Sequence, residues 1–427
     1  MKMRLKRIIL KDKDISLVAI LYCICILSAT VARWMNYANA LAIAVMLIHF
    51  VRTKRMTKSA LNIMWSAFIA IYPLADAFIR GEVGLSLFVA LCYITPMLFI
   101  LIGDIQYLEF CKNLFLFTKL FAWFQVLGIF LQAVIGGLYT SIAWRLFGYW
   151  SSGRTGFAPD ATFAAYIICF ATGVYFIELA IVKTQTGKIL WKNLIAAIVL
   201  FGMMVATGKR SSLIICLIAL MVVFFARASL YSSRLIKTVV SCVGVLVVAL
   251  IVIMISYYSG ADNAFGRFGA TLIGVANGED VTNMRSTWVE YMNEWRQGHE
   301  LIGIGWKSFS NRIMQTPYGG KVPNGHNVYL QILCEEGYIG LVLYVILMLY
   351  TIITAILNVV FYSDKKDEKM LLNAMVGLYI AVVFGIYCYF GNAIYDAVIY
   401  FYFFAAVQMI SIAQMLRRKY EHRMKRG

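Results

Sequence analysis

Apolar stretches of roughly 15–24 residues, separated by short polar segments, run through most of the chain. Stretches of this length can cross the apolar core of a bilayer, which needs about 20 helical residues. We expect twelve membrane-spanning helices, at residues 15–33, 37–51, 59–79, 83–103, 114–136, 161–182, 193–207, 213–226, 238–258, 339–362, 370–390 and 397–416. The pattern predicts an all-α polytopic membrane protein.

The composition agrees with this fold class. Of the 427 residues, 62% are hydrophobic and only 14% are charged. A soluble domain keeps about 25% of its residues charged, so a single globule in water could not bury this much apolar surface. The nine cysteines lie mostly in or beside the expected spans, without zinc spacing or a disulfide framework. We therefore expect no metal and no cofactor.

The net charge of +18 could indicate a nucleic-acid partner, but its distribution argues against one. With the N-terminus inside, the short inner segments hold 26 of the 39 lysines and arginines. This is the positive-inside asymmetry of a membrane protein with both termini in the cytoplasm. We expect contact with membrane lipids and no nucleic acid.

One connection is far longer than the others. Residues 259–325 form an outer loop of about 67 residues, and loops of this length are usually functional or disordered. Met284, Trp288, Tyr291 and Trp295 recur at helical spacing, which favours an ordered amphipathic helix at the membrane interface. The chain then has three parts: a transmembrane bundle of about nine spans (1–258), a large extracytoplasmic loop (259–325), and a last part with three spans and a basic cytoplasmic tail (326–427).

The segment after this loop has the strongest local pattern. On one helix, five residues would share a face at spacings of four, three, four and three: His326, Leu330, Leu333, Gly337 and Gly340. The two glycines would let a neighbouring helix approach closely. Glu336 lies near the edge of this face at membrane depth, where an ionisable group is usually paired. The alternative is an interfacial histidine at a helix start, with the glutamate in a structural hydrogen bond.

Two shorter segments carry outer cations. Lys209 and Arg210 lie in a tight turn between two short spans, where a pyrophosphate group could explain them, because arginine pairs with phosphate oxygens through two parallel bonds. Snorkelling to the interface is the alternative. Arg154 could bind an anion in the segment 153–160, although a helix-start loop with a capping Asp160 is equally compatible. Arg285, by position alone, could equally form a surface ion pair.

Four motifs together resemble one known family. The hallmark helix of that family, His-Asn/Ser…Leu…Leu…Glu-Gly…Gly, matches His326-Asn327, Leu330, Leu333, Glu336-Gly337 and Gly340. Its Thr-Gly-Ser-Arg turn resembles Thr207-Gly208-Lys209-Arg210, with lysine where serine is usual. Its loop pattern resembles Arg285…Trp288 and Gly303-Ile304-Gly305. Its Arg…Gly…Pro-Asn segment resembles Arg154…Gly156…Pro159, with Asp160 in place of asparagine. The family is the O-antigen ligase and Wzy-type polysaccharide polymerase superfamily.

The resemblance implies a GT-C-like fold and a metal-independent, inverting glycosyl transfer from a glycan on undecaprenyl pyrophosphate. It implies that Arg210 and Arg285 stabilise the departing pyrophosphate, and that His326 acts on the acceptor hydroxyl as a base or as an orienting group. Arg154, Lys209, Glu336 and Asn327 would bind substrate. The expected place is the bacterial inner or plasma membrane, with the site on the extracytoplasmic side.

The favoured function is a polymerase of O-antigen or capsule repeats, whose partners are the lipid-linked oligosaccharide donor, a glycan acceptor and, as a further candidate, a chain-length regulator protein. An O-antigen ligase, which transfers the glycan to lipid A-core or another surface acceptor, shares this chemistry and remains open. A polysaccharide flippase is the alternative of another class. It would carry more charge at mid-membrane and roughly matched halves.

Overall fold

The computed structural model describes residues 13–30, 35–71, 87–102, 107–147, 154–158, 160–186, 189–228, 251–260, 263–277, 285–317, 325–394 and 396–424. Within these ranges the regular structure is helical and no strand forms; one isolated bridge joins Met56 and Ile102. The all-α prediction is confirmed.

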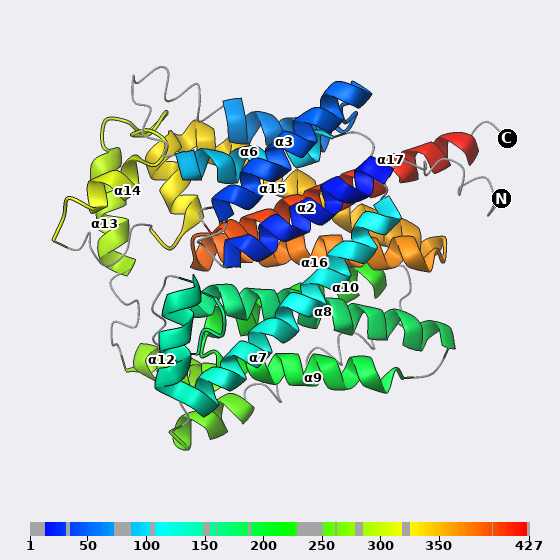
Figure 1. The fold of residues 1–427 in the computed structure, drawn as a ribbon. Helices are drawn as coiled ribbons and strands as arrows, with labels where there is room; N and C mark the ends of the chain where they lie inside the picture. The colour runs from blue at the N-terminus through cyan, green and yellow to red at the C-terminus, as the bar shows by residue number, and fades with distance from the viewer. Residues whose placement is uncertain are drawn as a thin grey trace.

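The helices form one bundle with a smaller group of helices at one end (Figure 1). In chain order they are α2 (Lys13–Thr30), α3 (Met35–Thr53), α4 (Ala60–Ser66), the π-helix η2 (Ala67–Ile71), α6 (Leu87–Leu101), α7 (Tyr107–Phe147), α8 (Ala161–Thr186), α9 (Trp191–Ala206), α10 (Arg210–Ala228), α12 (Ala264–Ala276), α13 (Arg285–Arg296), α14 (Ser308–Ile313), α15 (Val328–Asp364), α16 (Glu368–Phe390) and α17 (Ala397–Met424). The C-terminal end of α17 lies at the end of the bundle opposite α13 and α14.

Helical structure is present in all twelve regions expected to cross the membrane. Within the described residues, six helices are long and apolar enough to do so: α7, α8, α10, α15, α16 and α17. The chain is a membrane protein, and the number twelve stays a prediction. One boundary was wrong: residues 137–147, expected in an outer loop, continue α7 beyond a break at Gly136, where φ is 44°.

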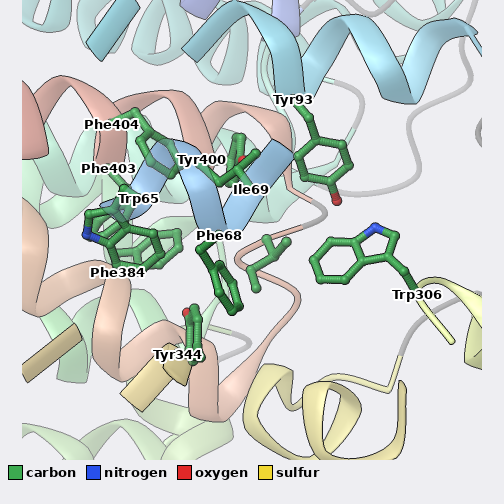
Figure 2. Close-up of a pocket in the computed structure, with 11 residues that line it drawn as sticks. Trp65, Phe68, Ile69, Tyr93, Trp306, Tyr344, Phe384, Tyr400, Phe403 and Phe404 are labelled. Atoms are coloured by element: carbon green, nitrogen blue, oxygen red, sulfur yellow. The ribbon is translucent and has the colours of Figure 1, made fainter. Parts of the chain in front are cut away.

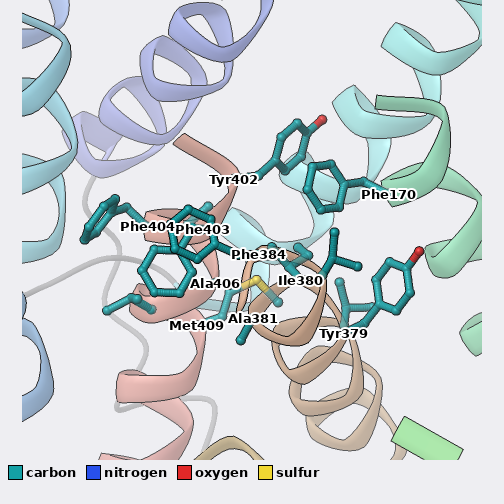
Figure 3. Close-up of a cluster of buried hydrophobic side chains, with 14 of the residues drawn as sticks. Phe170, Tyr379, Ile380, Ala381, Phe384, Tyr402, Phe403, Phe404, Ala406 and Met409 are labelled. Carbon is teal, nitrogen blue, oxygen red and sulfur yellow. The ribbon is translucent and has the colours of Figure 1, made fainter. Parts of the chain in front are cut away.

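Helices α16 and α17 form the centre of the bundle. In α17, 94% of the apolar window is buried inside the protein, whereas in α7 only 44% is buried, which leaves the rest of α7 for lipid. Aromatic rings fill the space between the central helices, where Phe384 of α16 stacks on Phe403 of α17 at 3.8 Å between ring centres (Figure 3). The small residues Ala381 and Ala406 leave room for this close packing.

Polar contacts also join the buried helices. Asn62 of α4 donates to the side-chain oxygen of Gln408 in α17, at 2.5 Å, and to the carbonyl oxygen of Ile100 in α6, at 2.8 Å. Lys119 in α7 pairs with Glu178 in α8 at 2.6 Å. Because lipid offers no partner to a polar group, these contacts hold particular helix pairs together.

The long loop contains its own small hydrophobic core, so the expectation of an ordered loop is confirmed for its described part. Trp288 and Met292 on α13 are buried against Phe309 and Ile313 of α14 and against Cys334 of α15. The aromatic stripe of α13 was expected to face the membrane interface. It packs instead on α14 and the first turns of α15, because these elements cover it.

Candidate functional site

His326 lies two residues before α15, in the left-handed backbone region, with φ of 52°. Its backbone N–H donates to the side-chain oxygen Oδ1 of Asn392 at 2.9 Å. Its ring nitrogen Nδ1 lies 3.3 Å from Nδ2 of the same side chain. Asn392 comes from the connection between α16 and α17 and is only 8% exposed. One buried carboxamide therefore holds both the backbone and the ring of His326.

Asn327 caps the start of α15, and its expected contact with substrate stays a prediction. Its side-chain oxygen accepts from the N–H of Leu330 at 3.1 Å, which is the bond of a helix N-cap. This cap satisfies a backbone donor that would otherwise lack a partner at the helix start. His326 is therefore placed just outside the first turn of α15, and the expectation that it lies on the helix face is wrong.

Around Gly337, the hallmark motif makes a backbone contact that the expectation of one continuous helix face did not include. At Gly337 α15 has a non-helical residue, with φ of 64°, so the expected continuous face is interrupted there. The turn Gly303-Ile304-Gly305 lies against this break: the N–H of Ile304 donates to the Cys334 carbonyl at 3.0 Å, and that of Gly305 to the Glu335 carbonyl at 2.7 Å. The two glycine motifs are thus two halves of one junction.

The backbone approach at this junction leaves no room for side chains. A Cβ on Gly303 would lie 2.3 Å from the Glu335 carbonyl, and one on Gly337 would lie 2.4 Å from the Leu301 carbonyl. Glu336 is 1% exposed and lies inside this junction, not on an open face. The structure therefore places Glu336 within the interior that supports His326, and substrate binding by Glu336 stays a prediction.

The cationic turn between α9 and α10 gathers positive charge from four places. Arg154 donates to the carbonyl oxygen of Ala206 at 3.1 Å, so the segment before α8 lies beside this turn. Arg210 donates to the carbonyl oxygen of Arg267 in α12, also at 3.1 Å. The Arg267 guanidinium in turn lies over Gly208, where an added Cβ would be 3.1 Å from its Nη1. We call Arg154, Lys209, Arg210 and Arg267 the cation cluster.

Asp160 partly balances the cation cluster. Its Oδ1 lies 3.5 Å from Nζ of Lys209 and accepts from the N–H of Thr162 at 2.5 Å. Partial burial raises the pKa of Asp160, but the positive charge of Lys209 and the Thr162 hydrogen bonds outweigh it, so that this pKa is lowered overall. The helix-capping interpretation of Asp160 is thereby confirmed, and Asp160 also carries the counter-charge of Lys209.

Asp396, which the sequence interpretation missed, joins the cation cluster to His326. Its carboxylate accepts from the hydroxyl of Tyr387, and its backbone N–H donates to the Asn392 carbonyl at 2.8 Å. Burial raises the pKa of Asp396 to about 7; the Tyr387 hydrogen bond opposes this rise, the charge of Asp160 adds to it and Lys209 opposes it. The charges of Asp160 and Lys209 thus act on Asp396. Asp396 is also bonded to Asn392, the residue that holds His326.

A second path links the same two regions. The hydroxyl of Tyr166 in α8 donates to the hydroxyl of Ser211 at 3.4 Å. The ring centres of Tyr166 and Tyr387 lie 4.3 Å apart. The signal for Asn392 and Asp396 was present in the sequence, because two polar residues stand in the six-residue connection between the expected spans 370–390 and 397–416.

Of the expected site residues, the structure brings together Arg154, Lys209 and Arg210 at one turn. Contacts through Tyr166, Tyr387 and Asp396 lead from this turn to Asn392, which holds His326. The backbone of Arg285 begins α13, as expected, while its side chain lies outside what the structure describes. The described residues contain no group of three or more His, Cys, Asp or Glu side chains that could hold a metal ion.

An aromatic hollow is lined by side chains of α4, η2, α6, α15, α16 and α17, by Trp306, and by Ile394 of the α16–α17 connection (Figure 2). Its lining includes Tyr93, Trp306 and Ile394, and Figure 2 shows Tyr93 and Trp306 toward one end of it. Trp306 directly follows the Gly303–Gly305 turn, and Ile394 is two residues from Asn392. The hollow is therefore bordered by the same two connections that support His326.

A family model described as O-antigen ligase matches residues 195–345. This span contains the cation turn, the long loop, His326 and the Gly337 break, so the resemblance drawn from the motifs is confirmed for that part of the chain. A comparison with curated proteins gives no match.

Proposed function

We propose that this membrane protein, whose residues 195–345 carry the O-antigen ligase domain of the ligase and polymerase superfamily, is a polysaccharide polymerase. It would join oligosaccharide repeats carried on undecaprenyl pyrophosphate, at the outer face of the bacterial plasma membrane. The observation that carries the proposal is a chain of contacts, through Tyr166, Tyr387 and Asp396, that leads from the turn of the cation cluster to the firmly held His326.

The chemistry of the reaction fits this arrangement. When the anomeric carbon transfers from the lipid, the leaving pyrophosphate gains negative charge, and that charge needs preorganised donors. Arg210 and Arg154 supply planar, permanently charged forks, and Lys209 and Arg267 add positive charge. Arg285 is proposed to join them from the start of α13.

The backbone carbonyls that hold Arg154 and Arg210 matter for this role. A guanidinium has five N–H donors in a planar fork, and the bond to a carbonyl fixes the direction in which that fork points. An arginine oriented in this way loses less side-chain freedom when a ligand binds. His326 would then act on the hydroxyl of the acceptor glycan.

Two alternatives make different predictions. An O-antigen ligase would use the same donor and pass the glycan to lipid A-core or another surface acceptor. A flippase would need mid-membrane charge for its cargo. Here the described mid-span residues Lys119 and Glu178 form an ion pair with each other at 2.6 Å, which favours a structural role.

A chain-length regulator protein is a proposed partner of the polymerase.

Purified protein in lipid nanodiscs, given only the lipid-linked repeat, tests the proposal. A ladder of products that each differ by one repeat is expected, and Arg210→Ala should abolish it, while Lys419→Ala in the exposed C-terminal part of α17 should not. Transfer seen only after a different acceptor is added would replace the polymerase with a ligase. Movement of the repeat across the bilayer without any new glycosidic bond would support the flippase.

A further inference from the structure

The contact between Asn392 and His326 determines which ring nitrogen of the histidine carries its proton. Two atoms of one carboxamide meet two atoms of His326: Oδ1 lies 2.9 Å from the backbone nitrogen, and Nδ2 lies 3.3 Å from Nδ1 of the ring. A backbone N–H can only donate, so the carboxamide atom that faces it has to be the oxygen. The other atom is then the NH₂ group, which can also only donate.

It follows that Nδ1 of His326 accepts a hydrogen bond and carries no proton. A neutral imidazole has one N–H, so the proton of neutral His326 is on Nε2. A second protonation, at Nδ1, would bring two N–H groups face to face at 3.3 Å. The arrangement therefore favours the neutral ring with Nε2 as a donor.

Both partners are held firmly enough for this assignment to persist. Asn392 is 8% exposed, and its carbonyl accepts from the N–H of Asp396 at 2.8 Å, immediately before α17 begins. On the other side, the Asn327 cap fixes the start of α15 directly after His326. Neither residue can turn away without disturbing the start of a buried helix.

We propose that Asn392 is the positioning residue of the site: it keeps His326 neutral with its proton on Nε2, so that His326 donates a hydrogen bond to a substrate oxygen instead of removing the acceptor's proton. This inference rests on the proposed glycosyl transfer. In that step the acceptor oxygen forms its bond to the anomeric carbon as the carbon–pyrophosphate bond breaks. The electron pair leaves with the pyrophosphate, and the hydroxyl proton passes to solvent water on the acceptor side, because in an inverting transfer the leaving group lies on the opposite face of the sugar.

An aspartate at position 392 would select the opposite tautomer. A carboxylate could accept from both the backbone N–H and Nδ1–H, which would leave Nε2 without a proton, as in a base-type histidine. Asn392→Asp therefore separates the two roles. It should harm a donor histidine, whereas it should preserve or improve a base.

The first test needs no substrate. With ¹⁵N-histidine incorporated into the full chain in nanodiscs, NMR distinguishes a protonated from an unprotonated ring nitrogen. The chain has four histidines, and the loss of one signal in His326→Gln assigns the relevant one. We expect an unprotonated Nδ1 and a protonated Nε2 at pH 7. A protonated Nδ1, in either the other tautomer or the charged ring, would overturn the inference.

The second test measures the rate of polymer formation and its pH profile in Asn392→Asp, with Asn311→Asp on the exposed face of α14 as the matched change of charge. We expect Asn392→Asp to slow the reaction by roughly 10²–10³-fold, the usual effect of losing one hydrogen-bond donor, and Asn311→Asp to leave it unchanged. A rate equal to or above wild type in Asn392→Asp would show that His326 is a base. If wild type makes no polymer, the proposed function fails, while the NMR result on His326 stands independently.

Discussion

The guanidinium of Arg210 donates to the backbone carbonyl of Arg267, 3.1 Å away, so that two arginines 57 residues apart meet at one turn. The Arg267 side chain folds back over Gly208 in the same turn. The two arginines are therefore held beside each other by backbone contacts at one turn.

Arg210→Lys should lower the rate of polymer formation by about 10²-fold, the usual effect of removing one preorganised donor at a developing charge. Lysine keeps the charge but loses the planar fork that can bond the Arg267 carbonyl and a phosphate together. The measurement is the initial rate with lipid-linked repeat. His299→Ala, an exposed change in the loop, is the control and should be near wild type. A wild-type rate in Arg210→Lys would remove Arg210 from the site.

The carboxyl group of Asp396 should make stability fall as pH rises. Its pKa is raised to about 7 by burial, well above the value in an unfolded chain, so the folded state binds the proton more tightly. The destabilisation is absent below about pH 4, grows between about pH 4 and pH 7, and is complete above that. Asp396→Asn removes it.

The thermal midpoint of Asp396→Asn should therefore exceed that of wild type by an amount that increases from pH 5 to pH 8. Asp364→Asn, at an exposed pair with Lys365, supplies the matched control and should show no such trend. A constant difference between Asp396→Asn and wild type across this range would mean that the carboxyl titrates as an ordinary aspartate.

Gly337→Ala should destabilise the protein by several kcal/mol, because its Cβ would lie 2.4 Å from the backbone of Leu301 and the residue has a positive φ. Gly202→Ala in α9 has no atom within 4 Å of the new Cβ and should be neutral or stabilising by up to about 1 kcal/mol. Thermal midpoints in one detergent compare the two. Equal midpoints would contradict the close approach at the junction.

Lys119→Met should lower the free energy of unfolding by about 3–5 kcal/mol, because Glu178 would keep its charge inside the bundle with Asn193, at 3.1 Å, as its side-chain partner among the described residues. Adding Glu178→Gln should recover much of this loss. The thermal midpoints of both single variants and the double variant form the required cycle. If the double variant is no more stable than Lys119→Met, the two side chains are not coupled.

The helical regions were predictable because their apolar stretches have the length that a bilayer requires, and the stretch that became α16 matches within two residues. The site was predictable in part. Lys209 and Arg210 stood out as cations on the less basic side of the membrane, and His326 belonged to a specific motif. In both cases local sequence carried the information.

Other features depended on contacts that no local pattern contains. The break at Gly337 arises because Gly303 approaches from a separate segment, and spacing alone favours a continuous helix there. Nothing in the local sequence distinguishes Arg267 from the other loop arginines, because its role depends on the packing of α12 beside α10. Asn392 is identifiable only when its distance to His326 is known, because the two are 66 residues apart.

The junction between Gly303–Gly305 and Cys334–Glu335 has a mechanical consequence. Because these backbones are bonded to each other, the Gly303–Gly305 turn holds the first turns of α15 in place, on the His326 side of the break at Gly337. His326 lies just before these turns. The position of His326 therefore depends on the Gly303–Gly305 turn as well as on Asn392.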